Sequence, residues 1–88
     1  MLVWTDYVLY RVSLRGFDLA KLEDIVKYSI ERYHDNETGR AVVVGHHDNE
    51  LVILPYEEDK GTITPITVHI TTRQQINMRL KTGRFSNE

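Results

Sequence analysis

The middle of the chain limits most strongly which folds this sequence can form. The β-branched run RAVVVGHH at 40–47 is followed by the turn residues Asp48 and Asn49, and then by LVILPY at 51–56. A second turn, EEDKG, leads to TITPITVHIT at 62–71. Strand-forming runs that are joined by such short turns pair with their neighbours in opposite directions. We therefore expect three strands in an antiparallel meander.

The last of these runs contains a histidine among small polar residues. Successive side chains of a strand point to opposite faces of the sheet, so the apolar and polar residues of this run separate. We expect the apolar set to face the core and the polar set to face away from it. Pro55 and Pro65 lack an N–H for the ladder and are expected at strand ends or at an edge. The apolar set is Ile66, Val68 and Ile70, and the polar set is Thr67, His69 and Thr71.

The segment before the strands begins with a predicted helix. Thr5 is a suitable N-cap, and Gly16 can take the left-handed conformation that often ends a helix. These end signals favour a helix from Asp6 to Arg15, although the alternation of apolar residues in this segment would also suit a strand. As a helix, it places three side chains in one row at i, i+4 and i+8, namely Tyr7, Arg11 and Arg15.

A second helix is expected to begin after Asp18, which is its N-cap. Its apolar residues follow a helical period as far as Tyr33, and Asn36 and Gly39 then form a turn. Neither helix is followed by a linker or a repeat. We therefore expect one domain over residues 1–88.

The C-terminal part of the chain concentrates positive charge. Residues 72–88 hold four cations against Glu88 alone, whereas the whole chain has a formal net charge of −2. Thr72 and Gln75 match a capping box, so a short helix is expected after the last strand, with a stop at Gly83. One stripe of this helix, Ile76 and Leu80, is apolar, and another, Arg73, Asn77 and Lys81, is polar.

These elements predict an α+β fold, with two N-terminal helices packed on an antiparallel β-meander and a short C-terminal helix. Helices and strands with one apolar face each need a shared core. The residues expected in this core are Leu22, Val26, Ile30, Val68, Ile70, Ile76 and Leu80.

Several classes of chemistry are not indicated by the sequence. There is no cysteine, so we expect neither disulfides nor thiolate chemistry. His46 and His47 are adjacent on a strand and point to opposite faces, so they do not predict a metal site, and no cofactor is expected. No run approaches the ~20 apolar residues of a membrane span, and Asp6 interrupts the N-terminal apolar run. We expect a cytoplasmic protein.

The residues that could carry chemistry gather at the junction of the last strand and the last helix. His69 titrates near neutral pH, and Arg73 in the first helical turn offers a planar fork for phosphate beside free N-terminal amides. Arg40 and Tyr56 are expected on the same sheet face. Metal-independent RNA cleavage needs a proton acceptor, a proton donor and cations for the phosphorane. The simpler interpretation is a surface histidine with polar neighbours.

Three short segments resemble the RelE/BrnT-like toxin superfamily, whose architecture is shared with barnase- and colicin-type ribonucleases. They are the R-x-x-x-R-G-F pattern from Arg11 to Phe17, GRAVVVG from Gly39 to Gly45 and ITVHITTRQQ from Ile66 to Gln75. The resemblance implies an endoribonuclease that cleaves messenger RNA and is neutralised by a cognate antitoxin.

Carried over onto this sequence, the resemblance implies a catalytic set of His69, Arg73 and Arg40. The candidate substrate-binding residues are polar or cationic side chains expected near this set, namely Tyr56, Asn77, Lys81 and Arg84. The net charge of −2 departs from the basic character of ribosome-dependent toxins. Two alternatives therefore stay open: a non-catalytic protein-interaction module of the same fold, and a small nucleic-acid binder. A homodimer is a further candidate assembly.

Overall fold

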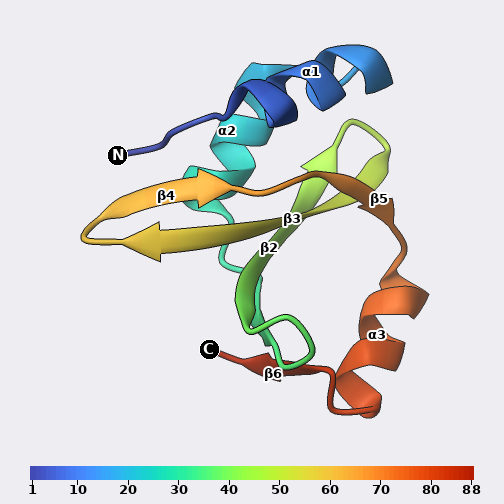
Figure 1. The fold of residues 1–88 in the computed structure, drawn as a ribbon. Helices are drawn as coiled ribbons and strands as arrows, with labels where there is room; N and C mark the ends of the chain where they lie inside the picture. The colour runs from blue at the N-terminus through green and yellow to red at the C-terminus, as the bar shows by residue number, and fades with distance from the viewer.

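The computed structural model describes all residues from 1 to 88 and contains three helices and one six-stranded sheet (Figure 1). The predicted α+β class, with two N-terminal helices, an antiparallel meander and a C-terminal helix, is confirmed. In chain order the elements are α1 (Asp6–Arg15), α2 (Leu19–Tyr28), β1 (Arg32–Asp35), β2 (Arg40–His47), β3 (Glu50–Asp59), β4 (Thr62–Pro65), β5 (His69–Thr71), α3 (Arg73–Lys81) and β6 (Phe85–Asn87).

The first segment is a helix because both of its ends are capped. The Thr5 side chain accepts a hydrogen bond from the amide of Val8 at 3.2 Å. Gly16 takes the left-handed conformation at φ 73°, and its amide donates to the carbonyls of Val12 and Ser13. The helix predicted from Asp6 to Arg15 is therefore confirmed.

The second helix is shorter than predicted, because its C-terminal part is replaced by a strand. The helix ends at Tyr28, and residues that we expected in its last turn form β1. The Ser29 hydroxyl donates to the carbonyl of Val44, and the Arg32 guanidinium donates to the carbonyls of Val26 and Ser29. These bonds turn the chain out of the helix and align β1 with β2.

The sheet is antiparallel with the strand order β4-β3-β2-β1-β6, while β5 pairs with the first half of β3. The strands β1 and β6 lie beside each other at one side of the sheet, and neither was predicted. At the other side the N-terminal residues cover the edge of β4. Val3 donates its amide to the carbonyl of Ile63, and Ile63 donates to the carbonyl of Met1.

The strand predicted over residues 62–71 is divided by a β-bulge. Tyr56 pairs with Pro65 and Ile53 pairs with His69, so three residues on one strand lie opposite two on β3. This extra residue shifts the alternation of side chains by one position. Pro55 lies inside β3 opposite this bulge, not at an end or edge as predicted, and its carbonyl accepts from the amide of Ile66. A proline is tolerated in this position because the ladder is already interrupted.

Apolar residues are buried on both faces of the sheet, not on one face as predicted. The helices α1 and α2 cover one face, which we call the α1/α2 face. Helix α3 lies against the other, which we call the α3 face, and the edge strand β6 contributes the side chain of Phe85 to it. The first core contains Val8, Val12, Phe17, Leu22, Ile25, Val26, Val43, Val52, Leu54, Tyr56 and Val68; the second contains Val42, Val44, Leu51, Ile53, Ile76 and Phe85.

The predicted core residues have mixed outcomes. Leu22, Val26, Val68 and Ile76 are fully buried, and Leu80 is partly buried against the second core. Ile30 and Ile70 are 98% and 44% exposed, so their assignment to the core is wrong. Ile30 lies beyond the actual end of α2, and Ile70 follows the bulge on a short outer strand.

Candidate functional site

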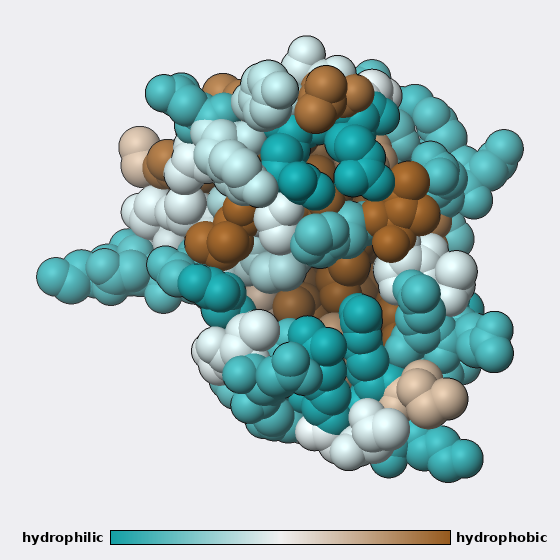
Figure 2. Space-filling view, turned by 45° about the vertical axis from the view of Figure 1, so that its right-hand side comes forward, coloured by the Kyte–Doolittle hydropathy of each residue, from teal (hydrophilic) through white to brown (hydrophobic).

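A cavity of about 500 Å³ lies on the α3 face of the sheet. Its floor is apolar and includes Val42, Ile53 and Pro55, and its walls come from the bulge, α3 and the start of β6. Figure 2 shows a hollow on this side of the molecule, with hydrophobic side chains at the floor and hydrophilic ones around the rim. The cavity gathers polar groups from distant parts of the chain.

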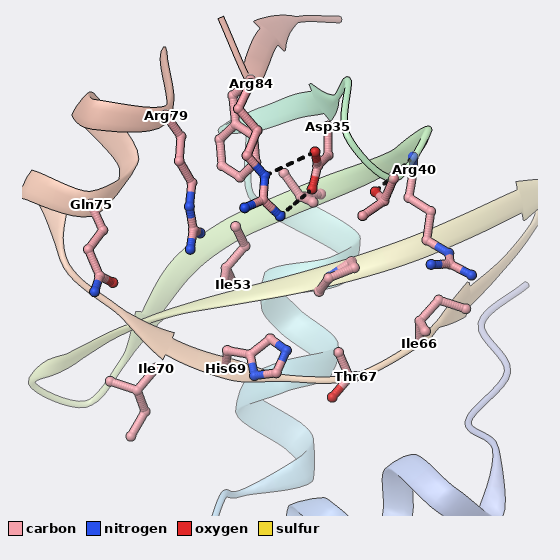
Figure 3. A pocket seen from close by; sticks show the side chains of 14 residues that line it. Asp35, Arg40, Ile53, Ile66, Thr67, His69, Ile70, Gln75, Arg79 and Arg84 are labelled. Carbon is pink, nitrogen blue, oxygen red and sulfur yellow. Dashed lines mark hydrogen bonds and ion pairs between the residues drawn. The ribbon is translucent and has the colours of Figure 1, made fainter. Parts of the chain in front are cut away.

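Opposite walls of this cavity carry the side chains that can bind an anion or transfer a proton. Gln75 and Arg79 reach from α3 toward the sheet, while His69 approaches from β5 on the other side (Figure 3). The other polar lining residues are Asp35, Thr38, Arg40, Thr67 and Arg84. The bulge is the reason that His69 belongs to this site, because it pairs the histidine with Ile53, whose side chain is part of the α3-face core.

His69 is held in its neutral form more strongly than an ordinary histidine. Partial burial of the imidazole lowers the pKa of His69 below its ordinary value of 6.5. The charges of three arginines lower this pKa further; they are Arg11, Arg15 and Arg79. A neutral imidazole is able to accept a proton near neutral pH.

The three arginines that lower the pKa of His69 have no carboxylate partner. Arg11 and Arg15 come from α1, and Arg79 comes from α3, where its guanidinium lies 5.5 Å from the centre of the Phe85 ring. None of them takes part in any of the ion pairs of the chain, whereas Arg40, Arg73 and Arg84 all do. No direct ion pair within the chain therefore neutralises their charge, and Arg79 is the one of the three that lines the cavity.

Arg84 is fixed at the cavity wall by a buried carboxylate. Its Nε and Nη2 donate to the two oxygens of Asp35 at 3.2 and 3.1 Å, and Asp35 is only 4% exposed. Burial raises the pKa of the Asp35 carboxyl. The hydrogen bonds from Arg84 and from the amide of Glu37 outweigh that effect, so the pKa is lower than its ordinary value. Asp35 is thus a carboxylate at neutral pH and positions Arg84.

The ion pair between Asp35 and Arg84 should make the folded chain less stable in acid. Because the folded-state pKa of Asp35 is depressed, its contribution is present above the ordinary value of 3.8 and is lost as the pH falls through the folded-state value. Asp35→Asn should remove part of this acid-linked loss, so that the difference in unfolding free energy between wild type and variant shrinks below about pH 4. Urea titrations from neutral to acidic pH measure this, and a constant difference at every pH would contradict it.

The structure separates the predicted site residues into two groups. His69, Arg40 and Arg84 line the cavity together. Arg40 also lies 3.4 Å from Glu57 through its Nε. In the strand register, Asp35 lies opposite Arg40 of β2 on one side and opposite Phe85 of β6 on the other. Because Phe85 belongs to the α3-face core, these side chains share the α3 face with His69.

The other predicted residues lie away from the cavity. Arg73 forms a two-pronged ion pair with Glu31 and borders a different groove. Tyr56 is buried on the α1/α2 face with the Arg32 guanidinium 5.6 Å from its ring centre, so it does not share a face with Arg40 as expected. Asn77 and Lys81 are exposed on α3 and line no cavity.

Arg79 is the main functional candidate that sequence reasoning missed. Gln75 and Arg79 are spaced i, i+4 on α3, which is the same spacing as the stripe that contains Arg73. The buried residue of the helix, Ile76, is adjacent to Gln75 in sequence, so this stripe turns to the cavity. The row formed by Arg11 and Arg15 was visible in the sequence, but its proximity to His69 depends on the tertiary fold.

Comparison with protein-family profiles, with curated proteins and with solved structures returned no match. No three His, Cys, Asp or Glu side chains lie close enough together to hold a metal ion. No helix has the length and apolar composition that crossing a bilayer requires.

Proposed function

We propose that this chain is a metal-independent endoribonuclease of the toxin type, as its resemblance to RelE/BrnT-like proteins implies. The main support is the pairing of His69 and Arg79 in one cavity: the pKa of His69 is lowered, and Arg79 has no carboxylate partner. An anion with a proton to give up is the ligand that such a site favours. The RNA phosphodiester with its neighbouring 2′-hydroxyl has both properties.

The reaction follows from the roles of these groups. Neutral His69 accepts the proton of the 2′-hydroxyl, and the resulting oxygen attacks the adjacent phosphorus. The bond from phosphorus to the 5′-oxygen breaks, which leaves a 2′,3′-cyclic phosphate. The departing 5′-oxygen takes a proton from the imidazolium or from water. Arg79 lies across the cavity and stabilises the charge that builds up on the phosphorane oxygens.

The net charge of the chain sets a condition on this function. At −2 the protein does not attract RNA over long distances, so attraction depends on the arginines that line the cavity, Arg40, Arg79 and Arg84. Binding should therefore weaken steeply with salt. The resemblance also implies an antitoxin as a protein partner.

The test is RNA digestion by the purified protein. We expect cleavage in the presence of a chelator, with cyclic phosphate ends, either by the protein alone or with ribosomes. The product ends are identified by mass spectrometry, which separates this chemistry from contaminating metal-dependent nucleases. Binding without cleavage at low salt would favour the nucleic-acid binder. If the protein neither binds nor cleaves RNA, the nuclease proposal is wrong and the interaction module is favoured.

A further inference from the structure

Helix α1 has a row of exposed apolar side chains on its outer surface. Tyr7, Tyr10 and Leu14 are 59%, 64% and 67% exposed, while Val8 and Val12 of the same helix are buried against the sheet. The exposed residues are spaced by three and four positions, which places them at alternating a and d positions of a heptad. Such a row forms the seam between two packed helices. In the folded chain α1 lies at the outside of the molecule, with the sheet on its inner side (Figure 1).

Opposite charges flank the two sides of this row. With Tyr7 and Leu14 at a positions, Asp6 occupies a g position and Arg11 an e position. The Arg11 guanidinium leans along the row, with its Nη1 3.5 Å from the Tyr7 hydroxyl and its centre 5.9 Å from the Tyr7 ring. Neither Asp6 nor Arg11 forms an ion pair within the chain.

We propose that a second copy of this chain binds here, with the two α1 helices packed in parallel about a twofold axis. In a parallel pair, a g residue lies beside the e′ residue five positions further along the partner helix. Asp6 and Arg11 have this separation, so each copy places its Asp6 beside the Arg11 of the other. The twofold axis makes two such ion pairs around one apolar seam. This inference does not depend on the proposed activity.

The charges also select the orientation and the occupant. In an antiparallel pair, e faces e′ and g faces g′, which would bring Arg11 against Arg11 and Asp6 against Asp6. A self-complementary row, acidic on one side and basic on the other, fits an identical helix better than a uniformly acidic or basic partner. The helix has only ten residues, so the interface falls short of the roughly 1,200–2,000 Å² of a stable complex. The dimer is weak and forms as the protein concentration rises.

Charge reversal gives a test that distinguishes this geometry from others. Asp6→Arg and Arg11→Glu each place like charges opposite each other twice, and each should raise the dimer dissociation constant about tenfold. Mixing the two variants in equal amounts should restore dimers. In the mixed pair, the arginine introduced at position 6 of one chain faces the glutamate introduced at position 11 of the other, and the unchanged Arg11 faces the unchanged Asp6. Sedimentation equilibrium measures the dissociation constants, and native mass spectrometry of the mixture identifies the heterodimer.

Two further variants distinguish dimerisation through the α1 row from nonspecific association and from misfolding. Tyr10→Glu should abolish the dimer, whereas Ile30→Glu, at a residue that is 98% exposed elsewhere, should leave it unchanged. Circular dichroism verifies that each variant is folded. A wild-type chain that stays monomeric at every concentration overturns the proposal and leaves the row to a different partner. A dimer that is insensitive to both charge reversals also overturns it.

Discussion

His69→Ala is expected to lower the rate of RNA cleavage by about 10²–10⁴-fold, which is the usual contribution of a positioned general base. His69 is only partly covered at the rim of the cavity and is not part of either core, so the free energy of unfolding should change by less than about 0.5 kcal/mol. His46→Ala is the matched control, because His46 lies on the same face of the sheet but outside the cavity. An equal loss of rate in both variants would contradict the assignment of His69 as the general base.

The pH dependence of the same reaction provides an independent readout. A general base works only when it is deprotonated, so the cleavage rate should rise with pH through the pKa of His69 and then level off. Because burial and the nearby arginines lower this pKa, the rise should lie below the ordinary value of 6.5. Removing the positive charge of Arg11 should move the rise toward higher pH.

The choice between Arg79 and Arg73 is tested by conservative substitution. Lysine keeps the charge and loses the planar fork, so Arg79→Lys should impair cleavage if the guanidinium contacts the phosphorane. Sequence reasoning pointed to Arg73, whose side chain is bound to Glu31 outside the cavity. Impairment by Arg73→Lys alone would restore the sequence-based site and remove the cavity from the reaction.

Ile76→Ala is expected to cost about 2–5 kcal/mol of folding free energy, because it removes a fully buried side chain and leaves a cavity. This is a large part of the roughly 5–15 kcal/mol that stabilises a typical domain. Ile76 is the buried residue of α3 and holds the helix against the α3 face. Since α3 carries Arg79, any activity should fall together with stability.

Ile70→Ala is the matched control for this substitution. Both residues are isoleucines near the same junction, but Ile70 is 44% exposed. Urea titration of both variants should give a clearly smaller cost for Ile70→Ala. Similar costs would mean that the assignment of the second core is wrong.

Local signals account for the parts of the fold that were predicted. Thr5 and Gly16 mark the two ends of α1, and the strand runs on either side of Asp48 place the β2–β3 hairpin. The strands β1 and β6 lack such signals, because each is short and is stabilised by pairing over a long sequence distance. His34 of β1 pairs with Ser86 of β6, for example. Propensity within a short window does not contain this information.

The residues that line the candidate site were predictable from the sequence only in part. His69, Arg40 and Arg84 were identified from residue type and position, and they do line one cavity. Choosing between the neighbouring stripes of α3 needs knowledge of which side of the helix packs on the sheet. That side is set by Ile76 together with Val42, Val44 and Phe85, which come from distant parts of the sequence.

The β-bulge between Pro65 and His69 determines which face of the sheet carries the histidine side chain. The pairing register decides this more than the composition of the segment does. If β5 continued the register of β4 without a bulge, His69 would lie opposite Val52 on the α1/α2 face. A chain that lacks position 66 or 67 would keep its histidine opposite Ile53 through an ordinary ladder, because the extra residue would be gone. A single deletion inside an unbulged strand instead turns the following side chains to the other face. This segment should therefore tolerate the loss of one codon, and homologous sequences that retain the site can show a one-residue gap here.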